Sequence, residues 1–494
     1  MTSTMEQVLT ESRTDSRAEA GAASSPCISG PASSPRPSRF AGKRVHFTGI
    51  AGSGMNGLAR ILMDCGAIVS GSDPNPNAQT LELGRRGARI SRGQHGELLA
   101  ADTDLVVRTA AIKDTNAEYL AACRYGLRVV KYAELLGQVM QERLGVAVAG
   151  THGKSTTTAM IAHALLKCGV DPSFVVGGTA PQLGGTGSRS GGGRAFVAEA
   201  CEFDRSFHNL RPTVALITNI EEDHLDCYSG IDDIVQSFRR FAQLVPPDGL
   251  IIANGQDARV GQAIGGLPTP VEWVAIDREA TWSTRVLGVD HGRYHGQVLY
   301  RGRAAATLRL SVPGAHNLFN ATMAVAACHA CGLEPARAAE VIDTFRGVDR
   351  RMTEVGTFNG ATVVDDYGHH PTEIRATLKA LRQRYEPRRL FCVFQPHQHS
   401  RTRFLLEDFA TSFGSADETV VPEIYFVRDS EEERNRISAA HLVERITRSG
   451  QQARHLADFP AIVNYLRGEL RPGDLVVTMG AGNVWEIGRN LVGA

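Results

Sequence analysis

The stretch Val146-Ala147-Val148-Ala149-Gly150-Thr151-His152-Gly153-Lys154-Ser155-Thr156 decides the fold of this chain. An apolar, β-prone run ends at a glycine, passes through a short polar turn and restarts after a lysine with apolar residues at helical spacing. This order predicts a strand, a loop and a helix. Glycines let the backbone N–H groups of such a loop converge on one point, and the helix N-terminus adds partial positive charge there. The stretch therefore predicts a phosphate-binding loop.

Two side chains of this loop are expected to act on a nucleoside triphosphate. Lys154 would reach the terminal phosphates, and the hydroxyl of Ser155 would take a coordination position on Mg²⁺. The spacing is shorter than in the usual P-loop, because the residue five positions before Gly153 is Val148 and the first glycine is Gly150. A glycine-bearing surface turn with a solvated lysine is the alternative that the loop alone leaves open.

The composition bounds the class of protein. The 494 residues suffice for three domains, since single cores stop growing at about 250 to 300 residues. The 53 Lys and Arg balance 53 Asp and Glu, which argues against a surface that coats a polyanion. Nine scattered cysteines do not resemble a secreted disulfide framework. No apolar run approaches the ~18 residues of a membrane span, so we expect a cytoplasmic protein with no nucleic-acid or membrane partner.

The N-terminal part of the chain predicts a tail followed by a small nucleotide-binding domain. Residues 1–40 are rich in Ser, Ala, Pro, Arg and Gly without apolar periodicity, so we expect them to be disordered. A strand from Arg44 then runs into a glycine-rich turn and a helix, and the next strand ends at Asp73, where a Rossmann-type fold holds a ribose hydroxyl. Further strands and helices predict a first domain over residues 41–142. Because the turn lacks strict G-x-G-x-x-G spacing, a purely structural glycine turn is the alternative.

Acidic residues follow two strands of the expected central domain, residues 143–345. Glu199 ends an apolar run, and His224 follows the strand predicted over 214–220, within an acidic cluster. Ligands bind at the carboxyl ends of strands in α/β sheets, and carboxylates with an imidazole suit a divalent cation beside phosphates. Solvated acidic loop caps are the alternative for any one of these residues.

Two other features of the central segment are a glycine-dense stretch and a pair of cysteines. The glycine-dense stretch 177–193 has too few apolar residues for a helix or strand, so we expect a flexible active-site loop. Cys328 and Cys331 form a Cys-x-x-Cys pair without a second pair or suitably spaced histidines. Buried thiols are therefore favoured over zinc.

The last segment, residues 346–494, resumes an alternation of strand and helix that predicts a further parallel sheet. Polar residues gather after two of its strands: Asp366, Tyr367, His369 and His370 after the first, and His397, His399 and Arg401 after the second. Four histidines suggest a metal site, whereas Asp, Tyr and Arg beside them suit a pocket for an amino acid or a carboxylate. We favour the pocket.

Together these blocks resemble the Mur ligase family, and within it the branch that adds L-alanine to UDP-N-acetylmuramate. The resemblance runs from about residue 44 to the C-terminus. The blocks that carry it are residues 49–55, 150–155, Glu199 with Asp204, 219–224, His316 and Asn317 with Asn320, 347–351, 365–373 and 396–403. The histidine of the phosphate loop and the run Asp-Asp-Tyr-Gly-His-His-Pro are similar to the L-alanine-adding branch.

The resemblance implies an α/β protein of three domains. These would be a Rossmann-like N-terminal domain for the UDP substrate, a central P-loop ATPase-like domain with a parallel sheet, and a Rossmann-like C-terminal domain for the amino acid. It implies ATP and Mg²⁺ as cofactors, and UDP-N-acetylmuramate and L-alanine as substrates. The muramoyl carboxylate would be activated as an acyl phosphate before the amine attacks. Both a monomer and a homodimer are compatible with this resemblance.

The resemblance also implies roles for individual residues. The ATP site would comprise Gly150, Thr151, His152, Gly153, Lys154, Ser155, Thr156, His316, Asn317, Asn320 and Arg351. Mg²⁺ would be held by Ser155, Glu199 and His224. The UDP substrate would meet Gly52, Ser53, Gly54, Met55 and Asp73, and the amino acid would meet Asp366, Tyr367, His397 and Arg401. The catalytic residues would be Lys154, Glu199, His224 and His369, with His369 or Asp366 as the base.

The chain departs from the family pattern at several of these places. Ala51 and Cys201 stand where a glycine and an acidic residue are usual, and Gln398 stands where an arginine often helps to hold the amino acid. A glutamine cannot make a charge-assisted pair with a carboxylate. We therefore expect Arg401 or the nearby histidines to take a larger part in binding the amino acid.

Three other functions share part of this pattern. A ligase that attaches a tripeptide to UDP-N-acetylmuramate would carry the same nucleotide blocks. A dinucleotide-dependent oxidoreductase is suggested by residues 49–73, although the phosphate loop and the acidic clusters argue against it. A non-catalytic P-loop binding module is the third alternative.

Overall fold

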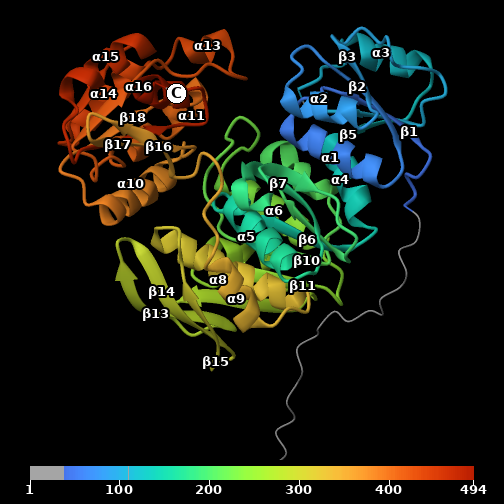
Figure 1. The fold of residues 1–494 in the computed structure, drawn as a ribbon, viewed down its shortest axis with the longest axis horizontal. Coiled ribbons are helices and arrows are strands. Elements are labelled where there is room, and N and C mark those ends of the chain that lie inside the picture. Colours follow the sequence, from blue (N-terminus) through green and yellow to red (C-terminus); the bar gives the residue numbers. More distant parts are fainter. Residues whose placement is uncertain (1–37, 110, 494) are drawn as a thin grey trace, which may run out of the picture.

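The computed structural model describes residues 38–109 and 111–493. Three sheets follow one another along the chain, each with its own helices, and we call them the first, central and third domains (Figure 1). The expected tail lies almost entirely outside the described residues. Among the residues described, none of the helices has the length and apolarity that a bilayer crossing demands.

The first domain contains five strands in the order β3-β2-β1-β4-β5, all parallel. Its strands are β1 (Arg44–Thr48), β2 (Ile68–Asp73), β3 (Arg89–Arg92), β4 (Leu105–Arg108) and β5 (Val129–Lys131), and its helices are α1 (Ser53–Asp64), α2 (Ala78–Arg85), α3 (Ala117–Arg124) and α4 (Tyr132–Met140). The order 3-2-1-4-5 is that of a Rossmann fold, so the expected Rossmann-like domain is confirmed.

The central domain contains ten strands in the order β15-β14-β13-β12-β11-β10-β6-β9-β7-β8. They are β6 (Leu144–Ala149), β7 (Ser173–Ala180), β8 (Thr186–Arg189), β9 (Ala195–Glu199), β10 (Val214–Ile217), β11 (Leu250–Asn254), β12 (Val271–Ile276), β13 (Trp282–Asp290), β14 (Arg293–Tyr300) and β15 (Arg303–Arg309). The helices are α5 (Lys154–Lys167), α6 (Ile231–Ala242), α7 (Ala258–Ile264), α8 (Ala315–Ala330) and α9 (Pro335–Ile342).

The middle of this sheet has the parallel pairing that the sequence predicts. Neighbours from β13 to β7 pair in parallel, whereas β14, β15 and β8 add antiparallel edges. The run before the phosphate loop is apolar throughout because β6 is buried on both faces. Val146 and Val148 face one hydrophobic core with α5 and α8, and Ala147 and Ala149 face another with α6.

The expected flexible loop over 177–193 is wrong. Strands β7 and β8 pair with each other there, and together with the short 3-10 turn between them they occupy more than half of this stretch. The glycines serve close backbone approach, since a Cβ on Gly187 would lie 2.7 Å from the carbonyl oxygen of Gly178, and one on Gly193 would lie 1.9 Å from that of Val170. Glycine richness here reflects tight packing instead of mobility.

The third domain contains six strands in the order β16-β17-β21-β18-β19-β20. Its strands are β16 (Thr353–Phe358), β17 (Ala361–Asp366), β18 (Leu390–Phe394), β19 (Glu418–Val421), β20 (Ala453–His455) and β21 (Leu475–Met479). Its helices are α10 (Pro371–Tyr385), α11 (His399–Phe404), α12 (Leu406–Ala410), α13 (Glu431–Arg434), α14 (Ala439–Arg448), α15 (Phe459–Glu469) and α16 (Trp485–Val492). Five strands are parallel as predicted, and β16 forms an antiparallel edge.

Because the backbone of Gly193 lies so close to the carbonyl oxygen of Val170, a larger residue at position 193 should lower the stability of the fold. Gly193→Ala should destabilise the chain by about 1–3 kcal/mol, because the new methyl group overlaps backbone that cannot move independently. Gly468→Ala is the matched control, since Gly468 lies within α15 with nothing near its Cβ position, and alanine there is expected to be neutral or stabilising. Thermal unfolding of both variants checks this. Equal midpoints for the two variants would contradict the packing explanation.

Candidate active site

The phosphate loop joins β6 to α5 through two glycines that no other residue can replace. Gly150 has φ +138°, and a Cβ there would lie 1.8 Å from Oγ1 of Thr218. Gly153 has φ +83°, and a Cβ there would lie 2.6 Å from Oδ1 of Asn320. The first backbone N–H groups of α5 have no partner within the helix. They are therefore available to an anion at this helix end.

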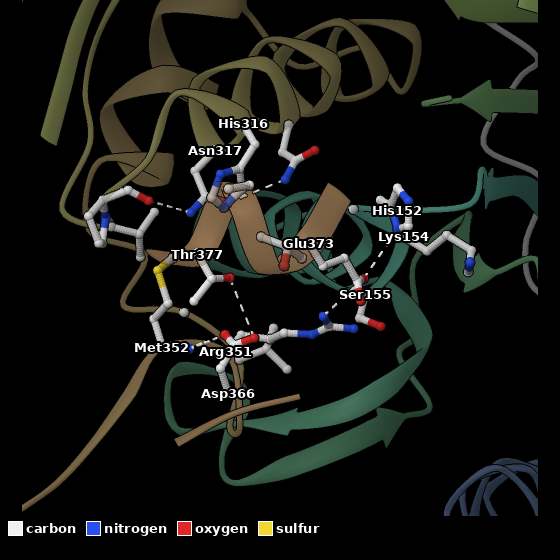
Figure 2. Close-up of a pocket in the computed structure, with 18 of the residues that line it drawn as sticks. His152, Lys154, Ser155, His316, Asn317, Arg351, Met352, Asp366, Glu373 and Thr377 are labelled. Carbon is white, nitrogen blue, oxygen red and sulfur yellow. Dashed lines mark hydrogen bonds and ion pairs between the residues drawn. The ribbon is translucent and has the colours of Figure 1, made fainter. Parts of the chain in front are cut away.

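A cavity of about 520 Å³ opens at this helix end. Figure 2 shows side chains from the central and third domains around it. The predicted ATP-site residues that line it are Thr151, His152, Gly153, Lys154, Ser155, Thr156, His316, Asn317, Asn320 and Arg351. Gly150, the remaining residue predicted for the ATP site, directly precedes Thr151 in the chain. The volume lies within the range of small-molecule sites, so the predicted nucleotide residues enclose one ligand-sized space.

The ammonium group of Lys154 is held by one carboxylate and the loop backbone. Its Nζ donates to Oε1 of Glu202 at 2.9 Å and to the carbonyl oxygens of Gly150 and Thr151 at 2.6 and 2.9 Å. Burial alone would lower the pKa of Lys154, but the Glu202 carboxylate raises it above its usual value. The lysine therefore stays protonated. Glu202 was not among the residues predicted for the site from the sequence. Its position three residues after Glu199, just beyond the end of a predicted strand, could have indicated it.

Two of the three predicted Mg²⁺ ligands contact each other beside the phosphate loop. Oγ of Ser155 donates to Oε2 of Glu199 at 2.8 Å, and the backbone N–H of Gly177 donates to the same oxygen at 2.9 Å. A Cβ on Gly177 would lie 2.4 Å from this oxygen, which explains a glycine there. A hydroxyl and a carboxylate next to a phosphate site are the hard oxygen donors that Mg²⁺ prefers.

The third predicted ligand, His224, belongs to a neighbouring acidic group. Its Nε2 lies 3.7 Å from Oε1 of Glu202 and 3.8 Å from Oδ2 of Asp223, and its backbone is left-handed at φ +52°. One ligand atom from each of these three residues lies within 4.8 Å of the others. Glu202 connects this group to Lys154, so the lysine and the predicted metal residues form one charged cluster.

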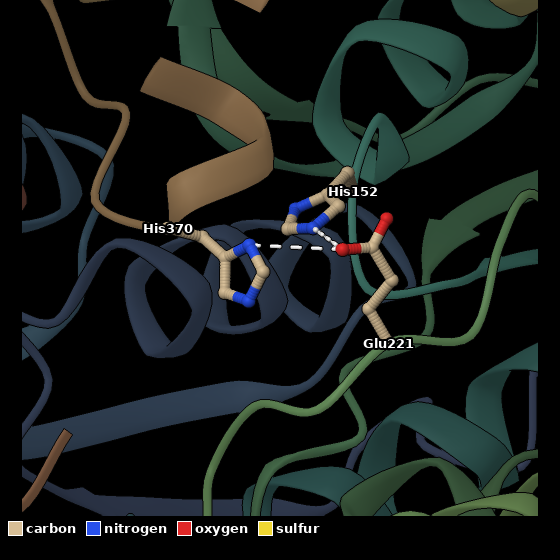
Figure 3. A group of neighbouring side chains, drawn as sticks. All are labelled: His152, Glu221 and His370. Carbon is tan, nitrogen blue, oxygen red and sulfur yellow. Dashed lines mark ion pairs between the residues drawn. The ribbon is translucent and has the colours of Figure 1, made fainter. Parts of the chain in front are cut away.

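A second charged group links the phosphate loop to the third domain. Figure 3 shows His152 beside Glu221 and His370. Nε2 of His152 lies 3.6 Å from Oε2 of Glu221, and its Nδ1 lies 3.3 Å from Oε1 of Glu373 at the start of α10. The ring of His370 lies 4.6 Å from that of His152. His152 thus joins carboxylates from two domains.

The charges of this group follow from its geometry. Burial alone would lower the pKa of His152, but Glu221 and Glu373 raise it to about 9. His370 is different, because burial lowers its pKa. Its Nε2 donates to the carbonyl oxygen of Glu222 and its Nδ1 accepts from the N–H of Thr372. Both ring nitrogens of His370 are occupied, so we interpret the group as an ion-pair network and not as a metal site.

A cavity of about 300 Å³ lies between the first and central domains. Its lining includes Gly52, Gly54, Met55, Thr109, Lys131, Tyr132, Asp204 and Asn209. Lys131 and Asp204 form an ion pair of 3.1 Å between the two domains. Asp73 is not among the residues that line this cavity, and its carboxylate accepts hydrogen bonds from the N–H groups of Ala51 and Asn75. Ser53, another residue predicted for the UDP substrate, is the first residue of α1.

The residues predicted for the amino acid do not share one cavity. Asp366 lines the large cavity, and burial raises its pKa to about 6. The Tyr367 ring lies near the guanidinium groups of Arg350 and Arg351, at 4.9 and 5.2 Å. His369 donates from Nδ1 to the carbonyl oxygen of Tyr367, and burial lowers its pKa to about 4. This histidine is therefore neutral near pH 7.

Arg401, which is expected to take a larger part in binding the amino acid, is paired with a carboxylate of the central domain. Its Nε and Nη2 donate to Oδ1 of Asp223 at 2.9 and 2.7 Å, and the arginine is only 7% exposed. Its Nη1 lies 3.2 Å from Nδ1 of His397, whose pKa burial lowers to about 3. A small cavity of about 10 Å³ lies beside Arg401, lined also by His224, Asp226 and Gln398.

The Cys-x-x-Cys pair is not a metal site in the described part of the chain. Cys328 is fully buried in the central core and burial raises its thiol pKa, as it does for Cys331. Neither cysteine belongs to a cluster of metal-ligating side chains among the residues described. The expectation of a buried thiol is confirmed for Cys328.

Comparison with known proteins covers the chain from its first strand onward. Residues 44–144 match the family model described as Mur ligase family, catalytic domain, residues 148–328 match the Mur ligase middle domain, and residues 350–482 match the Mur ligase, glutamate ligase domain. UDP-N-acetylmuramate--L-alanine ligases of Caldanaerobacter subterraneus and Pelotomaculum thermopropionicum are 41% and 43% identical, each over 91% of this chain and 97% of the relative.

Solved structures show the same three-domain arrangement. The UDP-N-acetylmuramate-alanine ligase of Thermotoga maritima has a TM-score of 0.75 and 25% identity, over 91% of this chain and 98% of that one. A murein peptide ligase of Psychrobacter arcticus has a TM-score of 0.69 and 27% identity, over 92% and 98%. The predicted α/β fold class is confirmed.

The His152 network predicts a pH-dependent stability. A pKa that folding raises from 6.5 to about 9 stabilises the folded state fully below pH 6.5, and this contribution disappears as the pH rises to 9. We expect a loss on the order of 1–3 kcal/mol over that window in the wild type and a flatter profile for His152→Gln. His291→Gln, at an exposed histidine outside the network, is the control. Parallel wild-type and His152→Gln profiles in thermal unfolding would contradict this prediction.

Proposed function

Because this chain belongs to the Mur ligase family, we propose that it catalyses the ATP-dependent ligation of L-alanine to the muramoyl carboxylate of UDP-N-acetylmuramate, with release of ADP and phosphate. The structural observation that carries this proposal is the large cavity, where Lys154 and the Ser155–Glu199 pair face Arg351 and Asp366 of the third domain. The relatives that share about 40% identity over nine tenths of the chain bear the name of this activity. The reaction belongs to peptidoglycan precursor synthesis.

The reaction needs activation because a carboxylate is a poor electrophile. The muramoyl carboxylate attacks the γ-phosphorus of ATP, the bond to the β,γ-bridging oxygen breaks, and an acyl phosphate and ADP form. The amine of L-alanine then attacks the acyl carbon through a tetrahedral intermediate that expels phosphate. Phosphoryl transfer depends on positioning and on neutralising charge at the transferring group.

The residues of the large cavity supply that charge and position. Lys154 is permanently protonated and would exchange Glu202 for the phosphates of ATP. Burial, with the nearby Arg351, lowers the pKa of His316 to about 4, so this ring is neutral and suits the uncharged adenine base. The carboxamide of Asn317 donates to the carbonyl oxygen of Pro313, which fixes its orientation beside His316.

The donor set beside the phosphate loop fits Mg²⁺. Ser155 and Glu199 would hold the ion, with His224 on the other side of Glu202. When bound, Mg²⁺ supplies a Lewis acid that neutralises phosphate charge. A proton must also leave the alanine ammonium, and the two predicted bases are Asp366, whose pKa burial raises to about 6, and His369, whose pKa burial lowers to about 4.

The alternatives are not favoured. A tripeptide ligase shares this fold, as the similarity to a murein peptide ligase shows, but the curated relatives at about 40% identity bear the L-alanine name. A dinucleotide-dependent oxidoreductase would not need the phosphate loop that lines the cavity of about 520 Å³. The cytoplasmic location and the choice between monomer and homodimer stay predictions from the sequence.

Release of inorganic phosphate tests the proposed function directly. The purified chain with ATP, Mg²⁺ and UDP-N-acetylmuramate should release phosphate when L-alanine is added, and one amide product should form for each phosphate. L-serine, glycine, D-alanine and the L-alanyl-γ-D-glutamyl-diaminopimelate tripeptide complete the panel. Turnover with the tripeptide and none with L-alanine would overturn the proposal in favour of the recycling ligase.

The phosphate loop itself is tested by its lysine. Lys154→Ala should lower kcat by at least about 10²–10³-fold, because the charge that stabilises the transferring phosphoryl group is lost. Lys167→Ala removes the lysine from the last turn of the same helix and should leave the rate unchanged. Ligation by Lys154→Ala at the wild-type rate would eliminate the phosphate-loop argument.

A further inference from the structure

An incoming amino acid brings a carboxylate that needs a cation, and the arginine expected to supply it is occupied. Arg401 is buried and donates twice to Asp223. His369 and His397 are neutral near pH 7, because burial lowers the pKa of each well below its ordinary value. Neither histidine therefore supplies a positive charge, and Arg401 would have to give up Asp223 before it could bind a substrate carboxylate.

A different arginine, Arg428, is exposed and contacts a residue that lines this cavity. Nη2 of Arg428 donates to Oε1 of Gln398 at 3.3 Å, and Gln398 lines the small cavity together with His224. The guanidinium carbon of Arg428 lies 4.3 Å from the centroid of the Phe203 ring. No carboxylate of the described residues lies within 4.0 Å of this guanidinium group, so its charge is not neutralised by a neighbouring acid.

The backbone fixes Arg428 at this place. Residues His397 and Tyr425 form a β-bridge, and the N–H of Gln398 donates to the carbonyl oxygen of Tyr425 at 3.1 Å. The adjacent Asp429 accepts a hydrogen bond from Oγ of Ser400 at 2.6 Å, at the start of α11. The loop that carries Arg428 is therefore attached on both sides to the segment that carries Gln398.

The side chain of Gln398 shows which kind of ligand suits this place. Its amide oxygen faces the Arg428 cation, and its amide nitrogen lies 3.5 Å from Oδ2 of Asp226. The carboxamide of Gln398 thus already places the negative end of its dipole toward Arg428 and the positive end toward Asp226. A zwitterionic α-amino acid has the same order of charges over a similar span.

We propose that Arg428 is the residue that binds the α-carboxylate of L-alanine, in place of the arginine that position 398 lacks. This inference rests on the proposed ligase function and adds the orientation of its third substrate. The carboxylate replaces the Gln398 amide as the partner of Arg428, and a planar guanidinium receives a carboxylate through two parallel hydrogen bonds. The ammonium end then takes the place of the Gln398 amide nitrogen beside Asp226, in a cavity that His224 also lines.

The cavity must widen for this binding. At about 10 Å³ it holds about one water molecule, which is smaller than alanine. The residues around it come from two domains, since His224 and Asp226 belong to the central domain and Gln398 and Arg401 to the third. A small relative movement of these domains would open the space.

Steady-state kinetics of phosphate release test this assignment. Arg428→Ala should raise the KM for L-alanine by about 10- to 100-fold, because a charge-assisted pair is lost, while the KM values for ATP and UDP-N-acetylmuramate and the kcat at saturating L-alanine stay within twofold. Arg434→Ala is the matched control, since Arg434 stacks on Phe426 and pairs with Glu431 in the following helix, and it should behave as the wild type.

A second variant separates substrate binding from a structural effect. In Arg428→Ala/Gln398→Arg a guanidinium group returns from the neighbouring position that Arg428 contacts, and the KM for L-alanine should recover by at least fivefold relative to Arg428→Ala. An unchanged KM for L-alanine in Arg428→Ala would overturn the assignment, and so would equal increases in the KM values of all three substrates. Absence of phosphate release from the wild-type chain would instead remove the proposed function itself.

Discussion

The ammonium group of Lys154, whose side chain is only 12% exposed, constrains the rest of the active site. A charge removed from water is costly unless a partner and hydrogen bonds compensate it. Glu202 and two loop carbonyls do so here, and Glu202 in turn lies beside His224. The strand that ends at Glu199 must therefore deliver its following residues to the phosphate loop. This requirement explains why β9 lies directly next to β6 in the central sheet.

The two outer domains are attached to the central domain by different forces. One hydrophobic core extends from the first domain into the central one and contains both Phe47 and Phe207. The cores of the third domain contain only its own residues. Its contacts to the central domain near the site are polar, as between Thr372 and Glu221 at 2.6 Å and between Arg401 and Asp223. Polar interfaces between domains permit relative motion, so the third domain is the one expected to move.

The sequence predicted most of the fold because the local signals agree with the tertiary structure. The apolar run before Gly150 is buried on both faces, and Pro371 begins α10 within the segment where strands and helices are predicted to alternate. The prediction over 177–193 was wrong because glycine at a close backbone contact and glycine in a mobile loop look the same in one sequence. The antiparallel edge strands could not be predicted either. Whether a strand runs parallel or antiparallel depends on the strand with which it pairs in the fold, and its own residues do not encode this.

The candidate site was less predictable from the sequence, since its residues meet only through pairing across domains. Lys154, Ser155 and Glu199 were predicted from a motif and a strand end, and they do lie together. Glu202, Glu373 and Asp223 were not, because their importance comes from the cations that the fold brings to them.

The cations around the substrate cavities are held by carboxylates until a substrate competes for them. Lys154 is paired with Glu202, His152 with Glu221 and Glu373, and Arg401 with Asp223. Such pairing lowers the cost of burying charge, yet it also means that an anionic substrate gains only the difference between its own contacts and those that it replaces. Arg428 differs because its partners are a neutral amide and an aromatic ring. A carboxylate that reaches this exposed arginine displaces water and the Gln398 amide but no competing anion, so the binding energy of this contact is not reduced by the loss of an existing ion pair.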